Sequence, residues 1–501
     1  MPIGVEGHAI EVEGHVSDGV IAMNVTGLAD TSINESKDRV RAAMINTGCT
    51  WPQRRITVGL SPASLPKHGS GLDLPIAIAI ASADNQISGA QLQDTMFFGE
   101  LSLDGRVRQV PGALLATISA KQKGCKKIVL AQADLELAEL VSDIQVIGVT
   151  HLSQVLNLCG GEFAEVSYPI ENEYEANDSQ SNYFDYSQVK GQTWGKFACE
   201  VAAAGGHHLA ILGPPGVGKT LLAERLPSIL PKLSRRHALE VAAIKSATER
   251  STHLSFEPPF AAPHHTSSYT SLIGGGSGVP IIGLATKAHR GVLFLDEAPE
   301  FATNVLDALR QPLESGLVSI SRRTFKIELP ALFQLVIAAN PCPCGHALDP
   351  HGRCQCTPTQ RRRYLGRISG PLMDRVDIRV VMDPPSAFEL DYSAPLAEDS
   401  TSIRARVENA RNRAAVRLRD TNWKKNAEIP SSAIRELFPL KDAANRRLNH
   451  YLANSRTSAR GVDRIARISW TIADLKDREH PNVEDVEVAI ALREAGGRWL
   501  I

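Results

Sequence analysis

The pattern of apolar and polar positions is most regular in the middle of the chain. Three short apolar runs occur at 209–212, 292–295 and 335–339, and helical stretches lie between them. Continuous apolar runs of this length are typical of strands that are buried on both faces. Strands that alternate with helices predict a parallel α/β sheet, so we expect residues 187–385 to form an α/β domain.

The first part of the chain has a less regular pattern. Residues 10–13 alternate between apolar and polar, 56–60 and 127–130 resemble short strands, and 74–81 resembles a buried helix. Strands and helices are therefore mixed, and residues 1–165 are expected to form a separate domain.

Two other stretches complete the division. Residues 171–181 are acidic and polar and could not bury a core, which predicts a linker over 166–186. From 386 to 501 the pattern is helical: apolar residues recur at steps of three and four, and Asn482 can cap a last helix. The apolar positions concerned are Ile465, Ile468, Ile472 and Leu475.

Composition narrows the class of protein only slightly. A chain of 501 residues with 43% apolar residues is expected to hold about three domains of a globular protein. The net charge of −1 means that any nucleic-acid surface must be local. We find no long apolar stretch and no basic leader, so we expect a cytoplasmic protein without membrane contact, in which the eight cysteines are not disulfide-bonded.

A phosphate-binding loop directly follows the first apolar run. The sequence matches G-x-x-x-x-G-K-[ST], in which backbone N–H groups hold phosphates and the lysine reaches the β- and γ-phosphates of a nucleotide. Its residues are Gly213, Pro214, Pro215, Gly216, Val217, Gly218, Lys219 and Thr220. A helical pattern comes next, and its N-terminus would add positive charge at the phosphates. The chain is therefore expected to bind a nucleotide such as ATP.

Polar residues also follow the second and third apolar runs. Asp296 is placed to hold Mg²⁺ together with the Thr220 hydroxyl, and Glu297 is placed to polarise the attacking water. Asn340 could orient this water or sense the γ-phosphate, although an asparagine after a strand is also a common turn residue.

These motifs together resemble those of AAA+ ATPases, and further stretches resemble one family. They are A-P-H-H-T at 262–266, G-G-G-S at 274–277, A-H-R-G at 288–291, N-P-C-P-C-G at 340–345 and S-G-P-L-M-D-R-V-D at 369–377. The chain is similar to the magnesium-chelatase-like ATPases of the bacterial competence protein ComM group, over essentially its whole length. One departure is that residues 282–287 replace the family's P-G-E-I-S-L, in an insert that is thought to approach the substrate.

The resemblance implies roles for two arginines. Arg375 matches the arginine finger, which reaches the γ-phosphate held by a neighbouring subunit, and Arg460 matches the sensor-2 arginine of a C-terminal helical lid. A finger that acts on the neighbouring subunit implies a homo-oligomeric ring, expected to be a hexamer.

Four of the cysteines are clustered. Cys342-x-Cys344 and Cys354-x-Cys356 could form a tetrahedral Zn²⁺ site that orders a loop rich in proline and glycine. His346 and His351 lie in the same loop and could replace one ligand. Reduced thiols without metal and a redox switch are alternatives.

Basic residues mark a possible DNA-contact surface. Residues 317–329 look like two strands joined by a basic tip, and the family places such a hairpin in the pore of its ring. Arg322, Arg323 and Lys326 would then face DNA phosphates, unless they form an ordinary solvated surface. A second basic run at 361–367 has the same two interpretations.

Residues 66–73 and 98–107 are similar to the proteolytic domain of Lon proteases. Gly71 stands at the position of the family's serine, and the stretch 111–120 has no lysine at either family position. A serine without its base is a poor nucleophile, so this Lon-like domain is expected to lack protease activity.

The family resemblance implies a motor that hydrolyses ATP and acts on branched or single-stranded DNA, as a branch-migration helicase in natural transformation or recombination. The alternative is a metal-insertion ATPase subunit of the magnesium-chelatase type, although such subunits generally lack the Lon-like domain and the four-cysteine loop.

Overall fold

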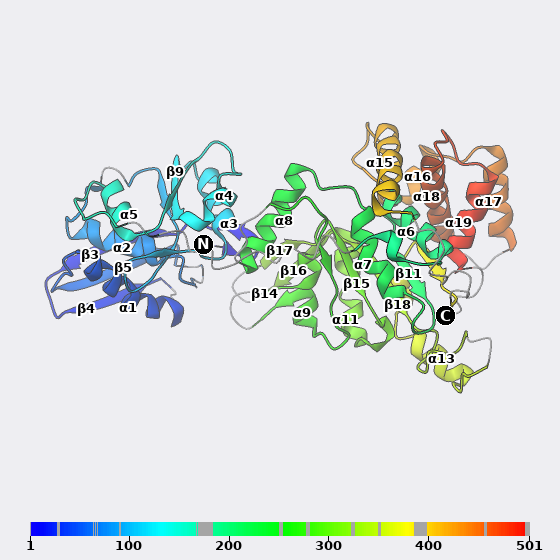
Figure 1. The fold of residues 1–501 in the computed structure, drawn as a ribbon, viewed down its shortest axis with the longest axis horizontal. Coiled ribbons are helices and arrows are strands. Elements are labelled where there is room, and N and C mark those ends of the chain that lie inside the picture. Colours follow the sequence, from blue (N-terminus) through cyan, green and yellow to red (C-terminus); the bar gives the residue numbers. More distant parts are fainter. Residues whose placement is uncertain are drawn as a thin grey trace.

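The chain forms three regions that follow one another along the longest axis of the molecule (Figure 1). A computed structural model describes residues 2–27, 31–63, 65, 67, 69–89, 92–166, 168, 184–249, 254–276, 281–321, 326–348, 352–384, 398–454 and 458–495. Arg322, Arg323, His351 and most of the expected linker lie outside the described residues.

The central region is built on a five-stranded parallel sheet in the order β12-β15-β18-β11-β19. Its strands are β11 (Leu209–Leu212), β12 (Phe260–Ala261), β15 (Val292–Leu295), β18 (Gln334–Ala339) and β19 (Ile378–Val381). All residues of β11, β15 and β18 are buried, which explains their continuous apolar runs. The predicted parallel sheet is confirmed.

Helices and two hairpins surround this sheet. The helices are α6 (Thr193–Gly205), α7 (Lys219–Ile229), α8 (Arg235–Thr248), α9 (Tyr269–Ile273), α10 (Leu284–Lys287), α11 (Thr303–Asp307), α12 (Arg310–Ser315), α13 (Pro358–Leu365) and α14 (Gly370–Met373). The hairpins are antiparallel and pair β13 (Gly274–Gly275) with β14 (Ile281–Ile282), and β16 (Leu317–Ser321) with β17 (Lys326–Pro330). The second pair confirms the hairpin expected over 317–329.

The N-terminal region is a mixed α/β domain. One sheet has the order β3-β5-β4 and another the order β10-β9-β6. The strands are β1 (Pro2–Ile3), β2 (Glu6–Gly7), β3 (Glu11–Ser17), β4 (Ala22–Thr26), β5 (Arg55–Ser61), β6 (Thr95–Phe97), β7 (Glu100–Leu101), β8 (Val107–Arg108), β9 (Lys127–Ala131) and β10 (Gln145–Val149); the helices are α1 (Thr31–Asn46), α2 (Asp73–Ala83), α3 (Ala113–Gln122), α4 (Leu135–Ala138) and α5 (Leu152–Leu158). The strands and the helix expected from the sequence are all present.

The C-terminal region is helical, as expected. Its helices are α15 (Ser400–Arg417), α16 (Ser431–Glu436), α17 (Asp442–Asn454), α18 (Ala459–Leu475) and α19 (Val483–Glu494). The Asn482 side chain accepts a hydrogen bond from the Asp485 backbone N–H, which confirms the predicted cap of α19.

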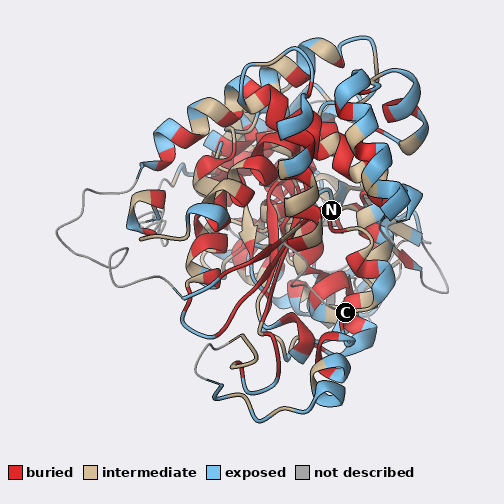
Figure 2. Ribbon diagram, turned by 90° about the vertical axis from the view of Figure 1, so that its right-hand side faces the viewer, coloured by how far each residue is buried: buried red, intermediate tan, exposed pale blue. Residues whose placement is uncertain are grey.

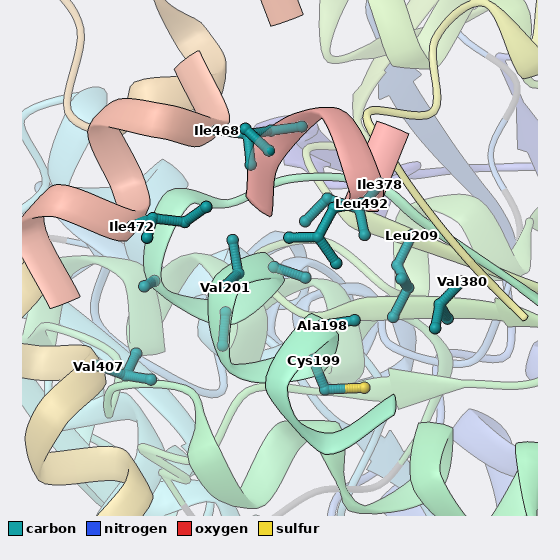
Figure 3. Packing of buried hydrophobic residues seen from close by; sticks show 14 of the residues in the cluster. Ala198, Cys199, Val201, Leu209, Ile378, Val380, Val407, Ile468, Ile472 and Leu492 are labelled. Atoms are coloured by element: carbon teal, nitrogen blue, oxygen red, sulfur yellow. The ribbon is translucent and has the colours of Figure 1, made fainter. Parts of the chain in front are cut away.

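One hydrophobic cluster joins the C-terminal helices to the sheet. It contains Val201 of α6, Leu209 of β11, Ile378 of β19 and Ile468 of α18, all fully buried (Figure 3). The buried strands lie inside and exposed residues line the outer faces of the helices (Figure 2). In the part of the chain that the structure describes, no helix is both long and apolar enough to cross a bilayer.

Candidate nucleotide site and its surroundings

The phosphate loop connects β11 to the first turn of α7. Gly216 and Gly218 have φ angles of +80° and +89°, in the region that only glycine enters without strain. Since α7 begins at Lys219, the first backbone N–H groups of the helix face the loop and provide donors for an anion.

Lys219 lies inside the loop and not in solvent. Its Nζ donates to the carbonyl oxygens of Gly213 at 2.7 Å and Pro214 at 2.9 Å, and to Oδ1 of Asn340 at 3.0 Å. Burial lowers the pKa of this ammonium from its ordinary value, although the charges of Asp296 and Glu297 oppose the shift. The structure thus brings Lys219 and Asn340 together, as required if both act on one phosphate.

Thr220 and Asp296 also meet. The Thr220 hydroxyl donates to Oδ2 of Asp296 at 2.6 Å, because β15 and α7 both present their ends at the carboxyl edge of the sheet. A hydroxyl and a carboxylate are hard oxygen donors of the kind that Mg²⁺ prefers. These two residues therefore fit a magnesium ion bound together with nucleotide phosphates.

Glu297 is held by a residue to which the sequence gave no role. Its carboxylate lies 3.4 Å from Nδ1 of His265, and its backbone, at φ +49°, donates from N–H to Oδ1 of Asp296 at 2.9 Å. The ring of His264 packs beside that of His265, with centroids 4.1 Å apart. Because His265 is far from Glu297 in sequence, only the paired histidines of the A-P-H-H-T stretch could have drawn attention to it.

Arg375 lies at the amino ends of the strands, whereas the phosphate loop lies at their carboxyl ends. Strands β11 and β19 are parallel and pair Leu209 with Ile378, so the loop follows the end of β11, whereas Arg375 precedes the start of β19. Arg375 forms an ion pair with Glu314 and donates to the carbonyl of Pro371 at 2.7 Å. It is therefore not part of the same phosphate site as Lys219.

Arg460 lies beside Arg375. Its guanidinium is 3.4 Å from Oδ2 of Asp374, and both arginines line a pocket of about 250 Å³. Arg464 and Arg467 of α18 line the same pocket. Burial lowers the pKa of Arg375, and the charges of Arg310, Arg464 and Arg460 lower it further. Such a concentration of guanidinium groups suits an anion of high charge, such as a phosphate.

The four clustered cysteines converge. Their sulfur atoms all lie within 4.8 Å of one another, and the Sγ atoms of Cys342 and Cys344 are 3.3 Å apart. The other two members of the group are Cys354 and Cys356. Four thiolates at such spacing fit a tetrahedral zinc ion, so the donor set and the geometry agree. His346 is not part of this group.

Lys326 is the one described residue of the three proposed DNA contacts. It begins β17, and its side chain is 61% exposed and lies 2.7 Å from Glu328 on the same strand. Its charge is thus partly balanced within the hairpin.

Gly71, the position that the sequence comparison aligned with the serine of Lon proteases, has no space for a larger side chain. A Cβ on Gly71 would lie 2.4 Å from Cε2 of Phe98, so a serine side chain has no space there. The neighbouring Ser70 hydroxyl bonds to Glu100, which is not a base of the lysine type. Helix α3, which would carry the lysine in a protease, instead buries Leu114 and Leu115 against Ala242 and Ala243 of α8.

The phosphate loop follows the inner strand β11, and the Asp296-Glu297 pair follows β15, with β18 between these two strands. Together with the helical C-terminal region, this arrangement defines a P-loop nucleotide-binding protein of the AAA+ class. Comparison of the chain with models of protein families identifies the family within this class. Residues 185–390 match "Magnesium chelatase, subunit ChlI", residues 12–134 match "Subunit ChlI of Mg-chelatase", and residues 397–493 match its C-terminal family.

Individual relatives extend over nearly the whole chain. The chain is 44% identical to an uncharacterized protein of Mycobacterium tuberculosis, over 99% of this chain and 97% of that one. It is 39% identical to the uncharacterized protein YifB of Escherichia coli (98% and 95%) and 40% identical to the competence protein ComM of Haemophilus influenzae (95% and 93%). A Lon protease of Rhizobium meliloti is 28% identical over 164 residues, which cover 30% of this chain.

The chain therefore belongs to the magnesium-chelatase-like AAA+ family that includes YifB and ComM. Members of this family are generally ATPases, which implies ATP and Mg²⁺ as cofactors.

Proposed function

We propose that the protein is a ring-shaped ATPase motor that moves branched DNA, as a branch-migration helicase in natural transformation or recombination. The observation that carries this proposal is the 40% identity to the competence protein ComM, over 95% of this chain and 93% of the relative. A similarity of this extent covers the N-terminal domain as well as the ATPase core.

The position of Arg375 supports a ring. A strand rises about 3.3 Å per residue, so the four-residue strand β11 alone separates the carboxyl and amino ends of the strands by roughly 10 Å. An arginine finger at the amino ends is unable to reach the nucleotide of its own chain. It would instead reach the nucleotide that a neighbouring chain holds. Arg460 would join it there, because both line one pocket. A closed ring, in our proposal a hexamer, gives every site such a neighbour.

The hairpin β16–β17 is the proposed DNA contact. Lys326, together with Arg322 and Arg323 of the tip, would meet DNA phosphates in the central pore, where a local basic surface suffices despite the chain's net charge of −1. The N-terminal domain would keep a Lon-type fold for assembly and not for proteolysis, since Phe98 occupies the space at Gly71.

The four-cysteine loop is proposed to hold a structural zinc ion. The convergence of the four sulfur atoms within 4.8 Å supports this assignment. We place the protein in the cytoplasm, where thiols stay reduced and free to bind metal.

A magnesium-chelatase-type metal-insertion subunit is the second candidate, because the matching families carry that description. The two candidates differ in what stimulates hydrolysis: DNA in the first case, and a partner subunit of a chelatase in the second.

The test is a four-way DNA junction incubated with purified protein and ATP. We expect ATP-dependent movement of the junction and faster hydrolysis when branched or single-stranded DNA is added. Lys219→Ala should lose ATP binding, whereas Glu297→Gln should bind ATP and hydrolyse it at least about 100-fold more slowly, because the attacking water loses its base. Hydrolysis that no form of DNA stimulates, without junction movement, would reject the motor. Normal hydrolysis by Glu297→Gln would reject Glu297 as the base.

A further inference from the structure

The four-cysteine loop touches the phosphate loop. A Cβ on Gly345 would lie 2.6 Å from both Cδ and Cγ of Pro215, so the backbone of Gly345 rests directly on the proline ring. Gly345 has φ +80° and donates its N–H to the carbonyl oxygen of Cys342 at 2.9 Å. The turn from Cys342 to Gly345 is therefore the part of the loop that contacts Pro215.

A second link runs through the chain itself. Cys342 is fully buried and follows Asn340 by two residues, and Asn340 accepts a hydrogen bond from Lys219 at 3.0 Å. Only Pro341 therefore separates Cys342 from the residue that contacts the phosphate-binding lysine. Both links, at Asn340 and at Gly345, flank the pair Cys342 and Cys344.

In the described part of the loop, contacts between thiols join this pair to Cys354. Cys354 lies 3.7 Å from Cys342 and 3.6 Å from Cys344, distances at which thiols form only weak hydrogen bonds, and Arg361 donates to Cys354 at 3.3 Å. A tetrahedral metal ion would replace these contacts with four strong bonds and would fix the turn at Gly345.

We propose that metal binding in the four-cysteine loop controls the affinity of the phosphate loop for nucleotide. The occupied loop holds Gly345 against Pro215 and Asn340 beside Lys219, so the nucleotide meets a site that is already ordered. Loss of the metal, by chelation, releases the turn and weakens nucleotide binding. This inference rests on the proposed zinc site. It assigns the site a regulatory role in addition to stabilising the loop.

Two sites that influence each other must do so reciprocally. If zinc tightens ATP binding by a given factor, ATP must tighten zinc binding by the same factor, because the two binding orders lead to one state. This equality distinguishes linkage between the two sites from general damage to the protein.

The experiment uses the full chain, reduced and loaded with zinc, and a fluorescent ATP analogue as the probe. Removal of zinc by a chelator in the presence of reductant should weaken nucleotide binding at least about fivefold, and added zinc should restore it. In a zinc competition assay, saturating ATP should raise the zinc affinity by the same factor. A preparation that binds one zinc ion with unchanged nucleotide affinity after its removal would overturn the regulatory role. A reduced preparation that binds no zinc would instead overturn the zinc site itself.

A matched pair of substitutions tests the contact. Gly345 and Gly352 lie in the same loop at φ +80° and +69°, so an alanine strains both backbones similarly. Only at Gly345 would the new Cβ meet Pro215, whereas nothing lies within 4 Å at Gly352. We expect Gly345→Ala to weaken nucleotide binding at unchanged zinc content, and Gly352→Ala to retain the wild-type affinity. Equal affinities of the two variants would contradict transmission through Pro215.

Discussion

In the nucleotide site, the role of a single residue depends on which side chains it contacts as well as on its own type. The motif identifies Lys219 and Thr220, yet their hydrogen-bond partners Asn340 and Asp296 follow two other strands of the sheet. Glu297 is a further example, because His265 at 3.4 Å engages the carboxylate that is expected to activate water.

The pairing of His265 with Glu297 predicts a specific kinetic effect. An exposed contact between two polar side chains is worth up to about 1 kcal/mol, so releasing Glu297 by His265→Ala should raise basal ATP hydrolysis by up to about fivefold. The affinity for ATP should not change, since His265 contacts the carboxylate and not the phosphate loop. Steady-state kinetics provide kcat, and a binding assay with the ATP analogue provides Kd. His264→Ala controls for loss of the neighbouring ring, because His264 bonds to Thr266 and packs beside His265. A fall in kcat for His265→Ala alone would show that the histidine assists Glu297.

Gly71 offers a second prediction at this scale. Gly71→Ser would place its Cβ within 2.4 Å of Phe98, so the domain should be destabilised by about 1–3 kcal/mol through overpacking, and no protease activity should appear. Thermal unfolding and a casein cleavage assay measure the two effects. Unchanged stability would mean that Phe98 moves aside freely.

At the scale of elements, one buried carboxylate joins the sheet to the C-terminal helices. Asp377 precedes β19, and its Oδ2 lies 3.1 Å from Nδ1 of His207, whose Nε2 lies 2.8 Å from the hydroxyl of Thr471 in α18. Arg464 of α18 approaches the same carboxylate at 3.5 Å. The helical region is thus fixed to the sheet by polar contacts as well as by the hydrophobic cluster.

The charge of Asp377 predicts a pH-dependent contribution to stability. Burial alone would raise the pKa of this carboxyl, but the hydrogen bond from His207 and the charges of His207, Arg464 and His208 hold it well below its ordinary value. A depressed pKa stabilises the fold at pH values above that of the unfolded carboxyl, about 3.9, and this contribution is lost as the pH falls through the folded pKa.

Asp377→Asn should therefore lower the free energy of unfolding at pH 7 by roughly 3 kcal/mol, because the mostly buried Arg464 loses its charged partner and the hydrogen bond with His207 is weakened. The difference from the wild type should shrink below about pH 4. Denaturant unfolding of both proteins at pH 7 and below about pH 4 measures this difference in the free energy of unfolding. Asp477→Asn is the control, since Asp477 is 78% exposed beside Arg413. Similar losses for both variants at pH 7 would contradict a special role of the buried carboxylate.

At the scale of the whole molecule, the sheet separates the two halves of the proposed catalytic site. Lys219 follows the carboxyl end of β11 and Arg375 precedes the amino end of β19, and these ends lie on opposite sides because the two strands run in the same direction. If the proposed ring forms, each complete site draws on two copies of the chain, and two inactive variants should complement each other.

Mixing tests this expectation. Lys219→Ala retains Arg375, and Arg375→Ala retains the phosphate loop, so each variant alone should be inactive. In rings assembled at random from equal amounts, about one quarter of the interfaces combine an intact loop with an intact arginine, and hydrolysis should return to about that fraction of the wild type. Remixing Lys219→Ala with a Lys219→Ala/Arg375→Ala double variant is the control and should stay inactive. A mixture without activity would contradict a shared site.

The sequence by itself determined the features that depend on residues close together in the chain. The phosphate loop, the Asp296-Glu297 pair, the buried strands and the cap at Asn482 were all identifiable, since local spacing and hydrophobic periodicity define them. The convergence of the four cysteines was likewise expected from two closely spaced pairs.

Only the tertiary structure decided which distant residues meet. The pairing of His265 with Glu297, the position of Arg375 across the sheet from Lys219, the contact of Gly345 with Pro215 and the occupation of the Gly71 site by Phe98 depend on strand order and side-chain packing. The physical reason is that hydrophobic periodicity states whether a residue is buried, whereas the identity of its neighbour depends on how separate elements are arranged in space.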